Sequence, residues 1–134
     1  NAHIPLGKTL SSFSDDNYTI FCGDAGSIAY YSRWNLLDGL NDKFIAQNGV
    51  KTNYLKEKHP ELVILISYNQ SIDWTNPPIA EEKYVLENNY TQLIPIKFDD
   101  NYYLIPFLKP NIKDYNLIKI SIENVAKESS QISV

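Results

Sequence analysis

The sequence predicts a mixed α/β domain with a partly parallel sheet flanked by short helices. Three observations favour this class. Short β-rich runs alternate with helix-forming segments in the first half of the chain, and the continuous apolar run at residues 62–66 is typical of a strand buried on both faces. In the second half, residues 92–98 and 101–108 alternate like a C-terminal β-hairpin. The 134 residues suffice for one domain with one core.

The first half predicts the element order β-α-β-α-α-β. Gly23, Asp24 and Gly26 stop the first strand, and Asp24 can cap the helix that follows. Pro60 ends the last helix before the apolar run. The connections are long enough for parallel strands with right-handed crossovers. The expected strands lie at residues 18–22, 33–37 and 62–66, the last at the sheet centre, and the expected helices at 25–32, 42–48 and 51–59.

The second half begins with a less regular stretch. Residues 68–89 predict a long irregular connection, of the kind that often carries function, with one short helix at residues 80–86. After it, Asp99 and Asp100 join the two hairpin strands, and residues 117–122 predict a further strand.

The ends of the chain differ from the middle in composition. We interpret residues 3–123 as one domain and the polar residues 124–134 as a frayed tail, because the tail has little apolar surface to bury. The chain starts at Asn1 and Ala2 without a methionine, so we interpret residues 1–2 as a cloning remnant in front of a piece of a longer protein.

The composition argues against several functions. A net charge of −4 disfavours binding to nucleic acid through its phosphates, which requires clustered Lys and Arg. The single Cys22 excludes an internal disulfide, and His3 and His59 do not have the spacing of a zinc site. No apolar run is long enough to cross a bilayer. We therefore expect no metal, no cofactor and no nucleic-acid partner.

Two acidic turns are the first candidate for a ligand site. Asp24 and Asp38 each follow a short strand, and parallel strands would place both carboxylates at the carboxyl edge of the sheet, where open α/β sheets bind ligands. Such a pair could act on a sugar or share a cation. The structural alternative, which the residue types favour, is that Asp24 caps a helix and Asp38 starts a turn with Gly39.

Aromatic side chains are the second candidate. They could stack on sugar rings or lie at a lipid surface, but they also fill the half-buried faces of strands and helices, which is the more ordinary role. Trp74, inside the irregular connection, is the best candidate for an exposed ring. The set comprises Tyr30, Tyr31, Trp34, Trp74, Tyr84, Tyr90, Tyr102 and Tyr103.

Part of the chain resembles a known family. The segments that carry the resemblance are DAGSIAYYS at 24–32, NLLDGLN at 35–41, and YLK at 54–56 leading into LVI at 62–64. They resemble the soluble C-terminal domain of bacterial polytopic membrane glycosyltransferases of the GT-C type, which use polyprenyl-phosphate sugars. The likeness covers roughly residues 6–67. Leu37 is an extra residue relative to the family's pattern, and it changes the alignment of Asp38.

The resemblance implies a function and a location. In that family the catalytic carboxylate lies in the membrane-embedded half, so this chain would contain no catalytic residue. It would lie on the extracytoplasmic (periplasmic) face, tethered to its own transmembrane region, and help to position a glycan acceptor or a polyprenyl-phosphate sugar. The substrate-binding residues to test first would be Asp24, Arg33, Asp38 and Asn41.

Two other classes of function remain open on the sequence. The chain could be a free-standing small enzyme that acts on a sugar or a phosphorylated metabolite through Asp24 and Asp38. It could also be an interaction module that uses a tyrosine-rich surface.

Overall fold

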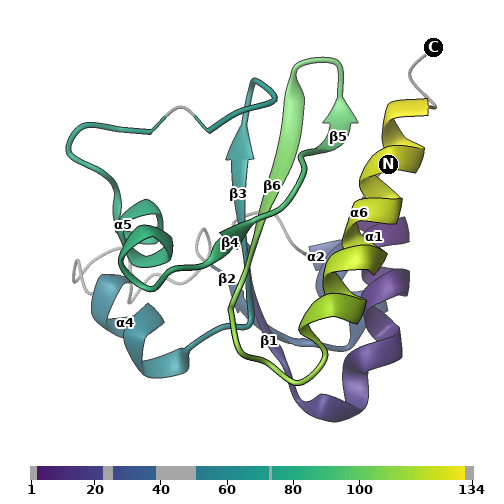
Figure 1. Ribbon diagram of the computed structural model, residues 1–134, viewed down its shortest axis with the longest axis horizontal. Helices are drawn as coiled ribbons and strands as arrows, with labels where there is room; N and C mark the ends of the chain where they lie inside the picture. The colour runs from purple at the N-terminus through teal and green to yellow at the C-terminus, as the bar shows by residue number, and fades with distance from the viewer. Residues whose placement is uncertain (1–2, 23–25, 39–50, 73, 132–134) are drawn as a thin grey trace.

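The computed structural model describes residues 3–22, 26–38, 51–72 and 74–131 (Figure 1). A central sheet lies between two layers of helices, and the expected mixed α/β class is confirmed. In this part of the chain, no helix is both long and apolar enough to span a membrane. The predicted helix at residues 42–48 lies outside the described residues.

The sheet has six strands in the order β2-β1-β3-β6-β4, with β5 also paired to β6. β1 runs parallel to both β2 and β3, whereas β6 runs antiparallel to β3, β4 and β5. The sheet is therefore partly parallel, as predicted. The strands are β1 (Thr19–Cys22), β2 (Asn35–Asp38), β3 (Leu62–Ser67), β4 (Thr91–Gln92), β5 (Ile96–Asp99) and β6 (Tyr102–Leu108).

β3 lies in the middle of the sheet and is buried on both faces. Leu62 and Ile64 point into one core, and Val63 and Leu65 point into the other. This arrangement confirms the role predicted for the apolar run, since successive side chains of a strand face opposite sides. The strand at residues 18–22 is also confirmed, and Cys22 is buried as expected.

One face of the sheet is covered by helices from both ends of the chain. α1 (His3–Leu10), α2 (Gly26–Ser32) and α6 (Tyr115–Gln131) pack there, with the 3-10 helix η1 (Ser11–Asp16) after α1. Gly7 lies where α1 meets α2: a Cβ at this position would be 2.8 Å from the Cβ of Tyr31. Because such a separation is too short for two carbon atoms, the close approach of these helices requires glycine.

The other face is covered by α4 (Lys51–Lys58) and α5 (Ala80–Glu87). α4 ends at Lys58, and the next residue, His59, has a left-handed φ of 48° and is followed by Pro60. α5 has Glu81 and Glu82 in its first turn, where the helix dipole favours negative charge. Both helices were predicted within one residue at each end.

The C-terminal hairpin is confirmed and the segment after it is corrected. β5 and β6 form the predicted antiparallel hairpin, but Asp99 belongs to β5, so Asp100 and Asn101 make the turn. The single strand predicted at residues 92–98 is divided into β4 and β5. Residues 117–122, however, belong to α6 rather than to a strand. The frayed tail is also wrong for residues 124–131, because α6 continues to Gln131 and buries Val125 and Ala126.

Candidate functional site

The connections of the parallel strands define a place for a ligand. β1 continues into α2 on one face of the sheet, whereas β3 leads to α5 on the opposite face. β1 and β3 are neighbours. Chain segments that leave adjacent parallel strands in opposite directions open a crevice between the strand ends, which is where open α/β sheets bind ligands.

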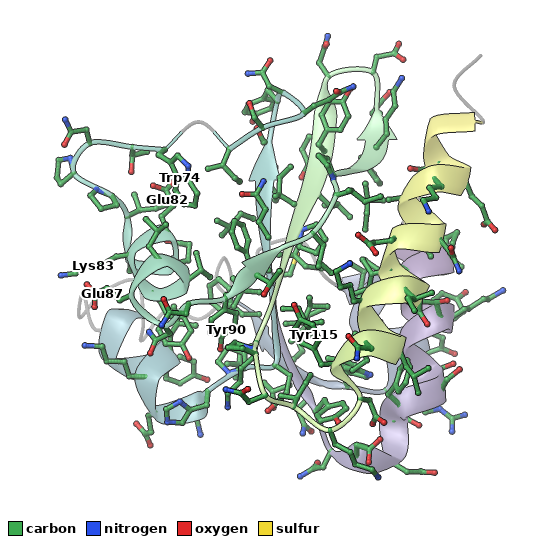
Figure 2. All side chains as sticks on the ribbon, in the orientation of Figure 1. Trp74, Glu82, Lys83, Glu87, Tyr90 and Tyr115 are labelled. Carbon is green, nitrogen blue, oxygen red and sulfur yellow. The ribbon has the colours of Figure 1, made fainter. Side chains whose placement is uncertain are left out.

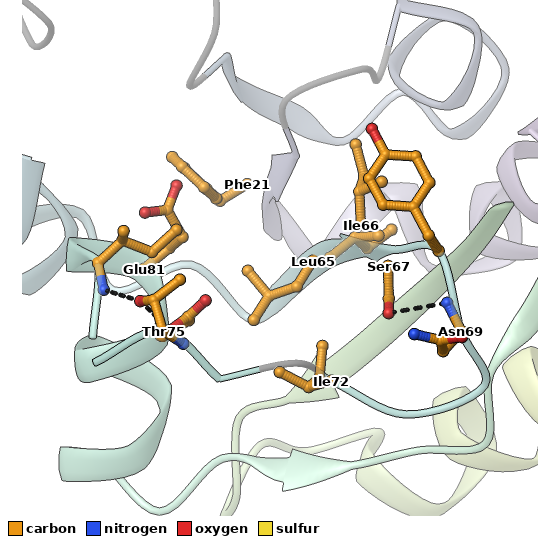
Figure 3. A pocket seen from close by; sticks show the side chains of 12 residues that line it. Phe21, Leu65, Ile66, Ser67, Asn69, Ile72, Thr75 and Glu81 are labelled. Carbon is orange, nitrogen blue, oxygen red and sulfur yellow. Dashed lines mark hydrogen bonds between the residues drawn. The ribbon is translucent and has the colours of Figure 1, made fainter. Parts of the chain in front are cut away.

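A pocket of about 390 Å³ lies at this point (Figure 3). Its apolar part comes from Phe21 at the end of β1, Leu65 in β3 and Ile72 in the segment after β3. Phe21 and Leu65 are almost completely buried. Water in contact with such a surface is displaced favourably by an apolar face of a ligand.

Polar and aromatic groups border the same pocket. Tyr68 and Asn69 follow β3 directly, and Glu81 lies in the first turn of α5. The Tyr68 ring is 71% exposed and makes an edge contact with Tyr102, with 6.1 Å between the ring centroids. The site therefore combines an apolar floor with an exposed ring, an amide and a carboxylate.

The segment after β3 is held in place by hydrogen bonds within itself. The Ser67 hydroxyl donates to the carbonyl of Ser71 (2.6 Å) and accepts from the backbone N–H of Asn69 (3.2 Å). These bonds close a turn at the carboxyl end of β3. The turn fixes the backbone that carries Tyr68 and Asn69.

A second set of hydrogen bonds, among Thr75, Ile79 and Glu82, joins this segment to α5. The Glu82 side chain is only 6% exposed, and its Oε1 accepts from both the backbone N–H (3.0 Å) and the hydroxyl (2.8 Å) of Thr75. The same Thr75 hydroxyl accepts from the N–H of Ile79, which is the N-cap residue of α5 (Figure 3). Thr75 thus stabilises the start of α5 and the loop over the pocket together.

Trp74 lies beside Glu82 (Figure 2). Its ring makes an edge contact with Phe107, at 6.0 Å between centroids, and it is 39% exposed. The expectation of an exposed ring at Trp74 holds in part, since Tyr30 and Tyr68 are more exposed.

The acidic turns predicted from the sequence can be placed only in part. The backbone register pairs Asp38 with Cys22 at the carboxyl ends of β2 and β1, two residues before Asp24. The parallel geometry behind that expectation is therefore present. Asp24 and Asn41 lie outside the described residues, and so does the side chain of Asp38.

Arg33 lies at the other end of β2. It precedes the strand with a left-handed φ of 62°, and its side chain is exposed. Five residues of extended chain span about 16 Å, so Arg33 and Asp38 do not form one compact site. The predicted strand at 33–37 also begins later than expected, at Asn35.

The paired tyrosines of the α5 layer are structural. The hydroxyls of Tyr84 and Tyr90 are 3.0 Å apart, and Tyr90 donates to the carbonyl of Pro60. Burial raises the pKa of both phenols, so they remain neutral hydrogen-bonding groups. Tyr90 lies between the sheet and the helices in Figure 2.

Most residues of the pocket were not singled out by their sequence. The useful signal was the length of the irregular connection, together with Trp74 inside it. Tyr68 carries no motif, and the Asn-x-Ser sequence that begins at Asn69 does not point to this pocket, so only the fold brings them next to Phe21. Within the described ranges, no group of three His, Cys, Asp or Glu side chains is arranged to hold a metal ion.

The protein is an α/β domain with a pocket at the crossover point of its parallel strands. A family model described as "Domain of unknown function (DUF8728)" matches residues 2–124, and the chain belongs to that family. Neither a curated protein nor a solved structure gave a match.

Proposed function

We propose that this chain is a non-catalytic domain that binds a glycan acceptor in the pocket between the ends of β1 and β3. The observation that carries the proposal is the position of an apolar pocket at the crossover point of the parallel strands, with Tyr68 and Asn69 on its border. That position is the one at which this class of sheet binds ligands.

The chemistry of the pocket suits a neutral sugar. A sugar ring has an apolar face of C–H groups and a border of hydroxyls. The exposed Tyr68 ring supplies a flat surface for the face, and the Asn69 amide can both donate to and accept from hydroxyls. No Lys or Arg is among the described residues that line the pocket, so a phosphate group would find no cation there.

The proposal extends to a parent protein. The resemblance of residues 24–41 and 54–64 to the GT-C glycosyltransferase domain supports a membrane glycosyltransferase in which this domain is extracytoplasmic and contacts its own transmembrane region. The hydropathy profile of the full-length protein tests this part. A multi-span hydrophobic region before residue 2 is expected, and its absence would remove the membrane part of the proposal.

Glycan binding can be tested on the chain alone. We expect neutral oligosaccharides to shift the amide NMR signals of Phe21, Leu65 and Asn69. Replacing Tyr68 with Ala should weaken binding about tenfold, since a stacked ring contributes on the order of 1 kcal/mol. Tyr30→Ala is the matched control, because Tyr30 is similarly exposed (77% against 71%) but does not line the pocket. Equal losses in both variants would contradict the proposal.

A second candidate is supported by the register of β1 and β2. It places Asp38 at the same carboxyl edge as the pocket. An enzyme that uses Asp24 and Asp38 should hydrolyse a glycoside or phosphoester, and Asp38→Asn should abolish turnover. A wild-type chain that is inert towards a broad substrate panel would eliminate this candidate and leave the binding role.

A further inference from the structure

A second pocket lies on the far side of the turn that borders the first. It has a volume of about 400 Å³ and is found where β5 and β6 meet α6. Tyr68 and Asn69 border the first pocket, and the next residue, Gln70, borders the second. The two pockets are thus neighbours along one loop, but they differ in charge.

The second pocket is lined by two cations and no acid among the described residues. Lys97 comes from β5 and Lys127 from α6, whereas the other lining residues are neutral. In a chain of net charge −4, such a local excess of positive charge marks a place that attracts anions.

Lys97 has a poor partner within the protein. Its side chain is only 24% exposed, yet among the described residues its ion-pair partner is Asp100, at 3.9 Å and with a side chain that is 95% exposed. An ion pair of that length with so exposed a partner contributes little. Burying part of a lysine side chain restricts the hydration of its charge, so a bound anion would compensate Lys97 better than Asp100 does.

Lys127 makes no ion pair with any residue in the part of the chain that the structure describes. The nearby lysine of the same helix, Lys119, differs in this respect because it pairs with Glu123 at 3.0 Å. Gln70 supplies an amide N–H and Tyr103 a phenolic O–H at the same pocket. Ile94, which is partly exposed, and Pro95 add an apolar border.

We propose that this pocket is an anion site that binds a phosphate group, with Lys97 and Lys127 as its two cationic ligands. The acidic residues near these lysines in the sequence include Asp99 at the end of β5, Asp100 after it and Glu128 on α6, and none of them lines the pocket. The same phosphate chemistry could belong to a free phosphate or to the headgroup of a lipid. The proposal is independent of glycan binding at the first pocket.

The test uses the whole chain and two probes. Inorganic phosphate is titrated while the amide signals of Gln70, Ile94 and Lys97 are followed by NMR. In parallel, co-sedimentation is measured with phosphatidylcholine vesicles that contain or lack phosphatidic acid. Binding in either arm should weaken as salt is added, because the interaction is between charges.

Variants that remove one charge distinguish binding at this pocket from nonspecific attraction to the positive charges of the protein. We expect Lys97→Gln and Lys127→Gln each to weaken binding about tenfold, as expected for loss of one charged hydrogen bond, and the double variant to abolish it. Lys113→Gln is the control, because it removes the same charge from an exposed residue that pairs with Asp16 elsewhere.

Each outcome either identifies the phosphate group as free or as part of a lipid, or shows that the pocket is not an anion site. Lysine-dependent binding of inorganic phosphate assigns the site to a free phosphate group. Lysine-dependent binding only to vesicles with phosphatidic acid assigns it to a lipid headgroup. Binding in neither arm, or binding that all three variants weaken equally, overturns the proposal.

Discussion

The two edges of the parallel strands are held together in different ways. At the amino edge, where β1, β2 and β3 begin, several side-chain hydrogen bonds join residues far apart in the chain: 24 positions for Trp34 and Leu10, 42 for Thr19 and Glu61, and 96 for Tyr18 and Asp114. At the carboxyl edge, the described side-chain hydrogen bonds after β3 join residues only 2 to 7 positions apart. The amino edge connects distant segments, whereas the loop at the carboxyl edge is organised locally.

Three side chains show what the amino edge does. The Glu61 carboxylate accepts from the N–H of Thr19 at 2.7 Å and so ties β3 to β1. The indole N–H of Trp34 donates to the carbonyl of Leu10 at 2.9 Å, and the Tyr18 hydroxyl donates to Asp114. These contacts hold α1, the strands and the start of α6 together, so damage there should affect the whole fold.

The carboxyl edge has the opposite character. Ser67 and Thr75 order the loop without any bond to a distant strand. Both pockets border this loop. A locally ordered segment can open at a smaller free-energy cost than the whole domain, which suits a region that admits a ligand. Several hydrogen bonds between distant segments thus lie at the amino ends of the parallel strands, and the proposed binding sites lie at their carboxyl ends.

The largest expected loss of stability comes from comparing Trp34, at the amino edge, with Trp74, in the loop at the carboxyl edge. Trp34→Ala should lower the free energy of unfolding by about 3–5 kcal/mol, because the ring is only 4% exposed and packs 5.2 Å from Tyr18. Trp74→Ala should cost about 1 kcal/mol, because that ring is partly exposed. Urea unfolding measures both. Similar losses in the two variants would contradict the conclusion that the amino edge contributes more to stability than the loop at the carboxyl edge.

A smaller loss of stability is expected when the hydrogen bonds of the Thr75 hydroxyl are removed. Thr75→Val removes the hydroxyl that Glu82 and Ile79 share, and should cost about 1–3 kcal/mol because the buried carboxylate loses one of its donors. Amide hydrogen exchange should accelerate in residues 74–76 and in Ile79 and stay unchanged in β1. Thr75→Ser keeps the hydroxyl and is the control. Acceleration that spreads to the amino edge would show that the loop is not a separate unit.

Arg33 offers a gain in stability. Because its φ of 62° is unfavourable for a side chain with a Cβ, Arg33→Gly should raise the free energy of unfolding by about 1 kcal/mol. Arg33→Lys keeps the strain and the charge, and should leave stability unchanged. Thermal unfolding measures the gain. Weaker glycan binding in the glycine variant alone would instead support the role in substrate binding predicted from the sequence.

The smallest effect at neutral pH concerns Tyr18. Burial, with the hydrogen bond to Asp114 and its charge, raises the pKa of this phenol to about 12. A raised pKa favours the protonated form in the folded state, so this stabilisation is complete below pH 10 and is lost as the pH rises towards 12. Tyr18→Phe should remove that loss. Stability measured from pH 8 to 12, with Tyr115→Phe as control, checks the sign.

Local patterns were sufficient for much of the sheet. The apolar run of β3, the turn residues after β1 and the alternation of β5 and β6 each predicted a strand correctly, because burial on one or both faces leaves a direct mark on the sequence. The parallel order followed from connection lengths. These features are the basis of the prediction that a ligand binds at the carboxyl edge.

α6 was predicted wrongly for a reason that its burial explains. Ile118, Ile120 and Ile122 alternate like a strand, and they precede a polar stretch. The structure buries Ile118, Ile122 and Val125 while Ile120 is exposed, which is helical spacing. The helical spacing continues past residue 123, where the predicted domain ends. Because residues 124–134 were assigned to a polar tail, the helical pattern was not recognised.

The sequence alone predicted the strands of the first half and most of the turns, because apolar spacing and turn residues act over a few positions. It did not determine which residues meet at a site. Phe21, Tyr68 and Glu81 come together only because β1 and β3 are paired and lead to helices on opposite faces. The same holds for Lys97 and Lys127, since contacts between distant segments depend on how the whole core packs.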